Sequence, residues 1–263
     1  MSHRNPSLAK KRIARDMLER YTGSPLSSFR KRIILTNFDY YLKRFNEIGE
    51  GKKSYGSAMR VSHSKKLDVT IIDFRIGAAS AALIMELVSV IGPTAGLFLG
   101  MSGGLHRSLK VGDFILPMAA IRDEGASQHY MPMQVPALPT FKVQKFVSQV
   151  LVEKGFDYRT GVIHTTDYRF WEFDEEFKKK LYSERVIGID MECASLFISG
   201  FANKVPIGAL LLVSDLPLKR SGIKTKKSAK EIFRRYTDIH LEIGVQAMSE
   251  IAERGEPIRH YRW

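Results

Sequence analysis

Seven apolar segments of strand length, separated by longer segments with helical character, constrain the fold of this chain most strongly. Their apolar residues stand in runs and do not alternate with polar ones, which is typical of strands in a sheet that helices cover on both faces. The seven expected strands are RIILTNF (32–38), DVTIIDF (68–74), AGLFLG (95–100), DFILP (113–117), GVIHTT (161–166), RVIGID (185–190) and PIGALLLVSD (206–215). The alternation of such strands with helices predicts an α/β fold.

Helix-like segments lie between and after these strands. The expected helices cover residues 79–91, 141–154, 191–202 and 228–254, and the last of them repeats apolar side chains at helical spacing. With 263 residues, 44% of them hydrophobic, the chain can bury one sizeable core. We expect a basic N-terminal arm (1–30) followed by a single domain (31–263).

Positive charge is concentrated in two segments, and the formal net charge is +13. Residues 1–44 carry eleven Lys and Arg against three acids, and residues 219–235 carry eight against one. Such basic faces bind either nucleic acid or a small phosphate-bearing ligand. Because aromatic residues are sparse in the basic N-terminal arm, we expect the second kind of partner and no nucleic acid.

Apolar runs and cysteine content bear on the compartment. The longest apolar runs, such as IGALLLVS (207–214), are far shorter than the roughly 20 residues that cross a membrane. The basic N-terminus lacks the apolar core of a secretory signal. The single cysteine, Cys193, excludes an internal disulfide framework and fits a reducing environment. We therefore expect a cytoplasmic protein with no membrane partner.

Two acids flank a methionine in GIDMECAS (188–195), where an expected buried strand ends. A carboxylate at Asp190 or Glu192 needs a partner there, because burying an unpaired charge costs several kcal/mol. The partner could be a structural Arg or Lys, a metal, or hydroxyl groups of a ligand.

Other strand ends also carry candidate binding residues, and ligands of such sheets bind where strands end. FLGMSGGL (98–105) is expected to run from a strand into a glycine-rich turn, whose N–H groups could meet an anion or a ribose. HTTDYRFWE (164–172) gathers aromatic side chains that could stack on a base or pack in the core. Ser214 and Asp215 end the most apolar strand. Desolvation would raise the pKa of an acid placed there, which suits it to donate a proton.

In their order and spacing, these motifs resemble the nucleoside phosphorylase superfamily, and within it the AMP nucleosidases. The resemblance also includes RYTGS (20–24), LTNF (35–38), IRDEG (121–125) and GIK (222–224), so it covers nearly the whole chain. It implies a three-layer αβα fold with a central mixed β-sheet. It also implies hydrolysis of AMP to adenine and ribose 5-phosphate, with no cofactor or metal, by a homo-oligomer that is expected to be a hexamer.

The resemblance assigns roles to individual residues. It implies that Glu192 accepts hydrogen bonds from the ribose hydroxyls above an apolar floor formed by Met191, while Asp190 takes the place of a second acid nearer the base. Asp215, oriented by Ser214, would protonate the adenine ring as the glycosidic bond breaks. The other expected substrate-binding residues are Gly100, Met101, Ser102, Tyr168, Arg169, Phe170, Trp171 and Lys224.

One departure from the superfamily favours water as the nucleophile. Phosphorylases of this superfamily hold inorganic phosphate with an Arg and a Ser around the glycine-rich segment, where this chain has Phe98 and Met101. Neither side chain binds an anion. Phosphorolysis by a purine nucleoside or uridine phosphorylase remains the alternative, and a nucleic-acid-binding protein built on a retired enzyme fold is a second one.

Basic residues are then expected to bind the 5′-phosphate of the substrate itself. The candidates are Arg20, Arg32, Arg75, Arg169, Lys219 and Lys224, of which Arg169 and Lys224 lie inside family-like motifs. Longer AMP nucleosidases carry a further N-terminal regulatory domain, and we expect this chain to be a short, catalytic form.

Overall fold

The computed structural model describes residues 8–219, 222–223 and 226–254. Its helices are α1 (Leu8–Thr22), α2 (Asp39–Gly49), α3 (Ala78–Ser89), α4 (Phe141–Glu153), α5 (Glu175–Glu184), α6 (Cys193–Ala202) and α7 (Lys226–Glu253), with short 3-10 turns at Leu26–Ser28, Ser127–His129 and Trp171–Phe173. Its strands are β1 (Arg32–Thr36), β2 (Lys52–Tyr55), β3 (Arg60–Ser64), β4 (Val69–Asp73), β5 (Ala95–Gly104), β6 (Phe114–Asp123), β7 (Tyr158–Thr166), β8 (Gly188–Asp190) and β9 (Ile207–Asp215).

In the described part of the chain the strands form one mixed sheet of nine, in the order β2-β3-β4-β1-β5-β8-β7-β6-β9. Strands β4, β1, β5 and β9 pair in parallel, whereas β8 is antiparallel to β5 and β6 is antiparallel to β9. The pairing of β5 with β9 closes the second half of the sheet into a ring of five strands. The ring brings the end of β9 beside β5 and β8.

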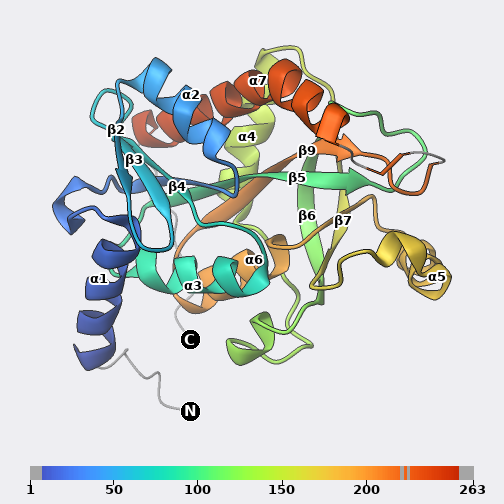
Figure 1. Ribbon diagram of the computed structural model, residues 1–263, viewed down its shortest axis with the longest axis horizontal. Helices are drawn as coiled ribbons and strands as arrows, with labels where there is room; N and C mark the ends of the chain where they lie inside the picture. Colours follow the sequence, from blue (N-terminus) through green and yellow to red (C-terminus); the bar gives the residue numbers. More distant parts are fainter. Residues whose placement is uncertain (1–7, 220–221, 224–225, 255–263) are drawn as a thin grey trace.

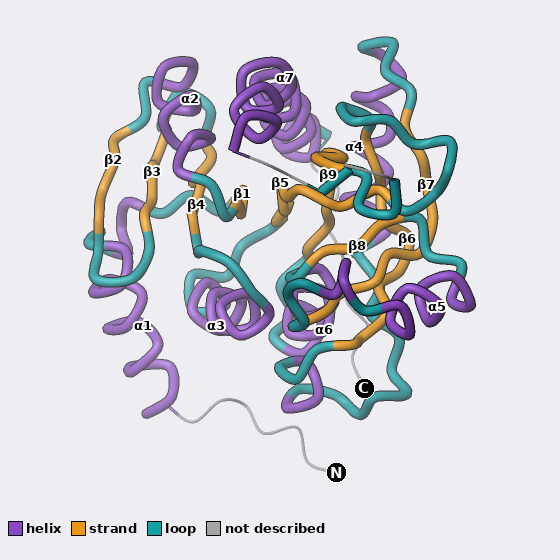
Figure 2. The backbone as a smooth tube through the Cα atoms, turned by 45° about the vertical axis from the view of Figure 1, so that its right-hand side comes forward, coloured by secondary structure: helices purple, strands orange, loops and turns teal. Residues whose placement is uncertain are grey.

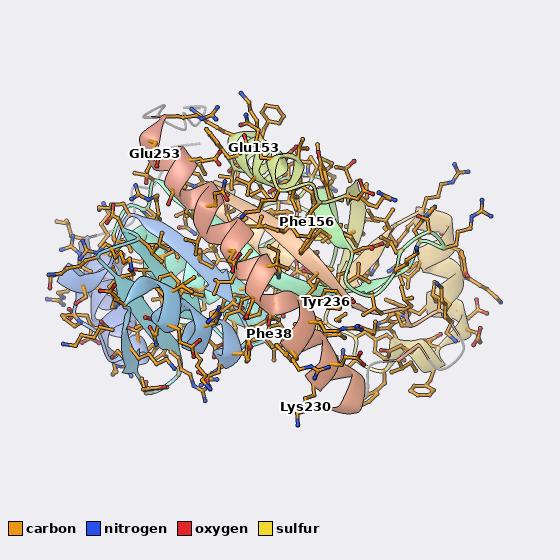
Figure 3. The ribbon with its side chains drawn as sticks, turned by 90° about the horizontal axis from the view of Figure 1, so that it is seen from above. Phe38, Glu153, Phe156, Lys230, Tyr236 and Glu253 are labelled. Atoms are coloured by element: carbon orange, nitrogen blue, oxygen red, sulfur yellow. The ribbon has the colours of Figure 1, made fainter. Side chains whose placement is uncertain are left out.

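Helices cover both faces of the sheet, as expected for an αβα fold. Figure 1 shows α2, α4 and α7 above the sheet and α1, α3 and α6 below it. Helix α7 crosses the upper face from Lys230 to Glu253, and Tyr236 and Phe38 lie near the middle of its path (Figure 3). The two faces carry separate apolar clusters. The upper cluster lies between the sheet and α2, α4 and α7, and the lower cluster lies between the sheet and α1, α3 and α6.

Each of the seven expected strands and four expected helices is present, with changed ends. The prediction of a glycine-rich turn after residue 100 is wrong, because β5 continues to Gly104 and pairs there with β8 and β9. A Cβ on Gly104 would come within 2.9 Å of Val213 and 3.0 Å of Leu216. The glycines therefore permit close strand packing and do not form a turn.

The N-terminal segment contains a helix that packs against the body of the protein. Ala14 and Leu18 of α1 are buried in the lower cluster, and Lys10 forms an ion pair of 2.8 Å with Glu86 of α3. None of the helices in the described ranges is long and apolar enough to span a membrane.

Candidate active site

Glu192 lies at the junction of three strand ends and is only 3% exposed. Its Oε1 accepts a hydrogen bond of 2.7 Å from the backbone N–H of Gly77, which follows β4, and the side chain of Asn37, after β1, also bonds to it. Gly77 has φ +98°, a conformation that favours glycine, and a Cβ there would meet no atom within 4 Å. The carboxyl group of Glu192 is thus fixed by three segments beside open space.

Burial changes the ionisation of Glu192. Desolvation, and then the nearby charge of Asp190, raise the pKa of Glu192 to about 8, although hydrogen bonds from Gly77, Met191 and Asn37 oppose the rise. A carboxyl group with this pKa is close to its titration point at neutral pH. Positive charge that develops on a bound ligand would therefore favour its ionised form.

Asp190 has protein partners at both of its oxygens. Thr165 Oγ1 donates to Oδ1 at 2.6 Å, and the backbone N–H groups of Glu192 and Cys193 donate to Oδ2 at 3.2 and 2.8 Å. Asp190 therefore binds the backbone where α6 begins and fixes the chain that carries Glu192. The expected contact of Asp190 with the base gains no support from these partners.

Asp215 ends β9 beside the glycine-rich part of β5, where it is paired with Gly103. Ser214 Oγ donates a hydrogen bond of 2.6 Å to Asp215 Oδ1, as expected if Ser214 orients the acid. Ser102 Oγ donates to the carbonyl oxygen of Ile189 at 2.9 Å and so ties β5 to β8. The structure thus brings Asp215 and the segment of Glu192 to the same closed part of the sheet.

Residues 98–101 contribute apolar side chains and glycine backbone to this region. Phe98 is fully buried, and its ring lies against Phe74 at a centroid distance of 5.8 Å. The same ring covers Gly100, where a Cβ would come within 2.4 Å of it. Met101 is partly buried against the upper cluster. Gly100 and Met101 can therefore offer backbone groups and apolar surface.

The aromatic loop after β7 divides into exposed and buried side chains. Tyr168, Arg169 and Phe170 are exposed, and Phe170 is 70% exposed in a left-handed conformation with φ 63°. Trp171 is instead buried with Leu181 and other residues of a small third cluster. Three of the four side chains predicted to bind the substrate are thus exposed, and Trp171 is not.

The basic candidates for phosphate lie in different surroundings. Arg20 pairs with Asp16 on α1, and Arg32 pairs with Asp68. Arg75 stands two residues before Gly77 and forms an ion pair of 3.2 Å with Asp73. Arg169 and Lys219 are exposed. The guanidinium of Arg169 lies 6.0 Å from the centroid of the Phe170 ring. Lys224 lies outside the described residues.

Sequence reasoning did not assign roles to Asn37, Gly77 or Thr165, although all three hold the two acids of GIDMECAS. Asn37 stands in LTNF and Thr165 in HTTDYRFWE, so both were within recognised motifs. Gly77 acts through its backbone N–H, for which residue type gives little signal. Figure 2 shows α5 next to β8 and α6, at the end of the molecule away from α1 and α3.

Comparisons with known proteins place the chain in a family. A family model described as the phosphorylase superfamily matches residues 31–243. AMP nucleosidase of Escherichia coli (strain K12) is 26% identical over 91% of this chain, which spans only 58% of that protein's length.

Solved structures extend the comparison. The crystal structure of AMP nucleosidase from Bacteroides thetaiotaomicron VPI-5482 has 40% sequence identity and a TM-score of 0.83, and the match covers 93% of this chain and 98% of that one. Uridine phosphorylase from Vibrio fischeri ES114 is similar in fold, with a TM-score of 0.77 at 21% identity over 90% of this chain and 99% of that one.

Proposed function

Because this chain belongs to the phosphorylase superfamily, we propose that it is an AMP nucleosidase, which hydrolyses AMP to adenine and ribose 5-phosphate. The observation that carries this proposal is the combination of a buried, backbone-held Glu192 with hydrocarbon at Phe98 and Met101. The first feature suits a ribose, and the second offers no side chain to inorganic phosphate. The 40% identity to the Bacteroides AMP nucleosidase over almost its whole length supports the same substrate.

Glu192 stabilises the sugar in this proposal. Its carboxyl group accepts hydrogen bonds from the ribose hydroxyls, with Gly77 and Asn37 fixing its position. As the bond between C1′ and the adenine nitrogen breaks, the sugar becomes a cation similar to the one in glycoside hydrolysis. The charge on the sugar favours ionised Glu192, so the interaction strengthens in the transition state.

Asp215 acts as the general acid. The electron pair of the breaking bond moves to adenine, and Asp215 gives a proton to a ring nitrogen of the leaving base. Ser214 holds one carboxyl oxygen at 2.6 Å and keeps the acid in one orientation. Water adds to C1′, and the proton that it loses restores Asp215 to its acid form, which completes the hydrolysis. General-acid help of this kind contributes roughly 10²–10⁴-fold.

Basic side chains bind the 5′-phosphate of AMP. Arg169 is exposed on the aromatic loop, and Lys224 follows Asp215 in the chain. Arg75 lies two residues before Gly77 and is the candidate nearest in sequence to the backbone that holds Glu192. We further propose that the protein acts in the cytoplasm as a homo-oligomer, a hexamer by analogy with the family, and that residues 31–263 form its catalytic domain.

The substrate preference tests this proposal. Hydrogen bonds to a charged phosphate contribute about 1.5–3 kcal/mol each, so two contacts favour AMP over adenosine by roughly 10²–10⁴-fold in kcat/KM. The measurement compares adenine release from AMP and adenosine in phosphate-free buffer. Arg169→Gln should reduce the preference while cleavage of adenosine stays nearly unchanged, with the exposed Arg159→Gln as control. Equal efficiency on both substrates would contradict a nucleotide-specific enzyme.

A further inference from the structure

His164 of β7 is fully buried, with a carboxylate at each ring nitrogen. Its Nδ1 lies 2.7 Å from Glu184 Oε2 at the end of α5, and its Nε2 lies 3.0 Å from Asp123 Oδ2 at the end of β6. An ionised carboxylate only accepts hydrogen bonds, so both ring nitrogens must donate. Two ionised carboxylates are therefore both satisfied by an imidazole that carries a proton on each nitrogen.

A second cation completes a row of alternating charges. Lys180 of α5 bonds to the other oxygen of Asp123 at 2.8 Å. Burial acts to raise the pKa of Asp123, but Lys180 and His164 together hold it below its usual value. In the described part of the chain, the ionisable groups in contact with His164 are Asp123 from β6 and Glu184 from α5, while β8 contributes the apolar Ile189 opposite it.

These charged contacts hold a helix that has few buried side chains. Among the described side chains of α5, only Leu181 is buried. At the other end of the helix, Asp174 accepts a hydrogen bond from the N–H of Phe177. The His164 contacts to Glu184, together with the bond from Lys180 to Asp123, therefore fix the C-terminal half of α5 against β6 and β7.

Helix α5 in turn supports the aromatic loop at the site. The ring of Phe177 lies 5.4 Å from the ring of His164, 5.4 Å from Tyr168 and 5.8 Å from Trp171, as measured between centroids. Trp171 packs in the third cluster with Leu218, three residues after Asp215. A shift of α5 would therefore move the loop that carries Tyr168, Arg169 and Phe170.

We propose that His164, held as a cation between Asp123 and Glu184, is a positioning residue that fixes α5 and, through Phe177, the substrate-binding loop 167–173. The role in substrate affinity rests on the proposed function, in which this loop contacts AMP. We call the hydrogen bonds of His164 to Asp123 and Glu184 the clamp. Without the clamp, the loop is in its binding position for only a fraction of the time. Affinity falls by that fraction, while the chemistry at Asp215 is preserved in the molecules that bind.

Glu184→Gln tests the clamp with a nearly isosteric change that removes one charge. The matched control is Glu175→Gln, which alters an exposed glutamate of the same helix that pairs with Lys178. We expect KM for AMP to rise about tenfold in Glu184→Gln with kcat changed less than about threefold, as a tenfold drop in the competent fraction requires. A KM within about twofold of the control would overturn the proposal.

Two readouts separate this inference from the proposed function, because neither needs a substrate. Nitrogen NMR of the wild-type protein at pH 7 should show both ring nitrogens of His164 protonated, and a neutral ring would contradict the clamp. Hydrogen exchange of the amides of residues 167–184 should be faster in Glu184→Gln than in Glu175→Gln, and equal rates would also contradict it. If both readouts are as expected but the wild-type protein does not cleave AMP, the clamp would stand and the nucleosidase assignment would be refuted.

Discussion

Two regions of the molecule bury polar groups in opposite ways. Between the sheet and α7, His240 Nε2 donates to the carbonyl oxygen of Leu210 at 2.9 Å, and Tyr41 donates to Nδ1 at 2.8 Å. At the strand ends, Glu192 and Asp190 lie two residues apart as buried acids. The core pair is satisfied in its neutral form, whereas the acid pair repels itself whenever both members are ionised.

The pKa values express this difference. Burial lowers the pKa of His240 to about 4, so the core histidine stays neutral, and the Leu210 hydrogen bond opposes the shift only in part. Burial and Asp190 raise the pKa of Glu192 to about 8. The core thus uses buried polar groups to join α2, β9 and α7, and the site retains a carboxyl group that weakens the fold when ionised. Such a cost in stability is typical of functional sites.

The largest expected effect belongs to Asp215→Asn. The change is nearly isosteric but removes the proton donor, so turnover on AMP should fall by at least about 10²-fold. Thermal unfolding should change little. Steady-state assays compare the variant with Asp157→Asn, at an exposed aspartate just before β7 begins. Turnover within a factor of about three of wild type would remove Asp215 from the mechanism.

Glu192→Gln is expected to separate activity from stability. Losing the carboxylate should lower turnover along with affinity, by roughly 10- to 100-fold, because the interaction with the ribose strengthens as charge develops. The exposed Glu153→Gln serves as control. If only KM changed, Glu192 would bind ground state and transition state equally.

The same variant should change the pH dependence of stability. Since the folded pKa of Glu192, about 8, lies above its ordinary value of 4.5, the folded state binds this proton more tightly than the unfolded chain. Its contribution is complete below pH 4.5 and is lost as pH rises toward 8. We expect the free energy of unfolding to fall less across this window in Glu192→Gln than in wild type, as measured by denaturant titration. Parallel curves for the two proteins would show that folding does not raise the pKa of Glu192.

The core histidine should have the opposite dependence. Its folded pKa of about 4 lies below the ordinary 6.5, so the unfolded chain takes up the proton first and stability falls as pH drops from 6.5 to 4. Tyr41→Phe leaves Nδ1 of His240 without its donor and should cost about 1–3 kcal/mol of unfolding free energy. Activity per folded molecule should stay unchanged. Tyr40→Phe, at a more exposed neighbour, is the control, and an equal loss in both variants would contradict the role of the His240 contact.

The core was predictable from the sequence because its signal is local. Strands such as β9 are apolar throughout, and α7 repeats its apolar residues at helical spacing. Strand β2, at the edge of the sheet, and β3 beside it were not predicted because most of their residues are polar. Helix α5 was not predicted because Leu181 alone among its described side chains is buried. Neither feature leaves a clear hydrophobic pattern.

The candidate site was predictable only in part. GIDMECAS and the Ser214–Asp215 pair indicated acids at strand ends, but the group that holds Glu192 is a backbone N–H 115 residues earlier, at Gly77. Likewise, HTTDYRFWE included His164 without indicating its two carboxylate partners, 41 and 20 residues away. Such contacts depend on the closure of the sheet, which residue type does not reveal.

Cleavage of AMP with and without inorganic phosphate tests the central claim most directly. The claim is that water, and not a bound phosphate, attacks the sugar, because Phe98 and Met101 provide no anion-binding side chain beside the site. We predict that purified protein releases adenine and ribose 5-phosphate from AMP in phosphate-free buffer. Added phosphate should give no sugar product that is phosphorylated at C1. An absolute requirement for phosphate, with ribose 1,5-bisphosphate as product, would contradict the account.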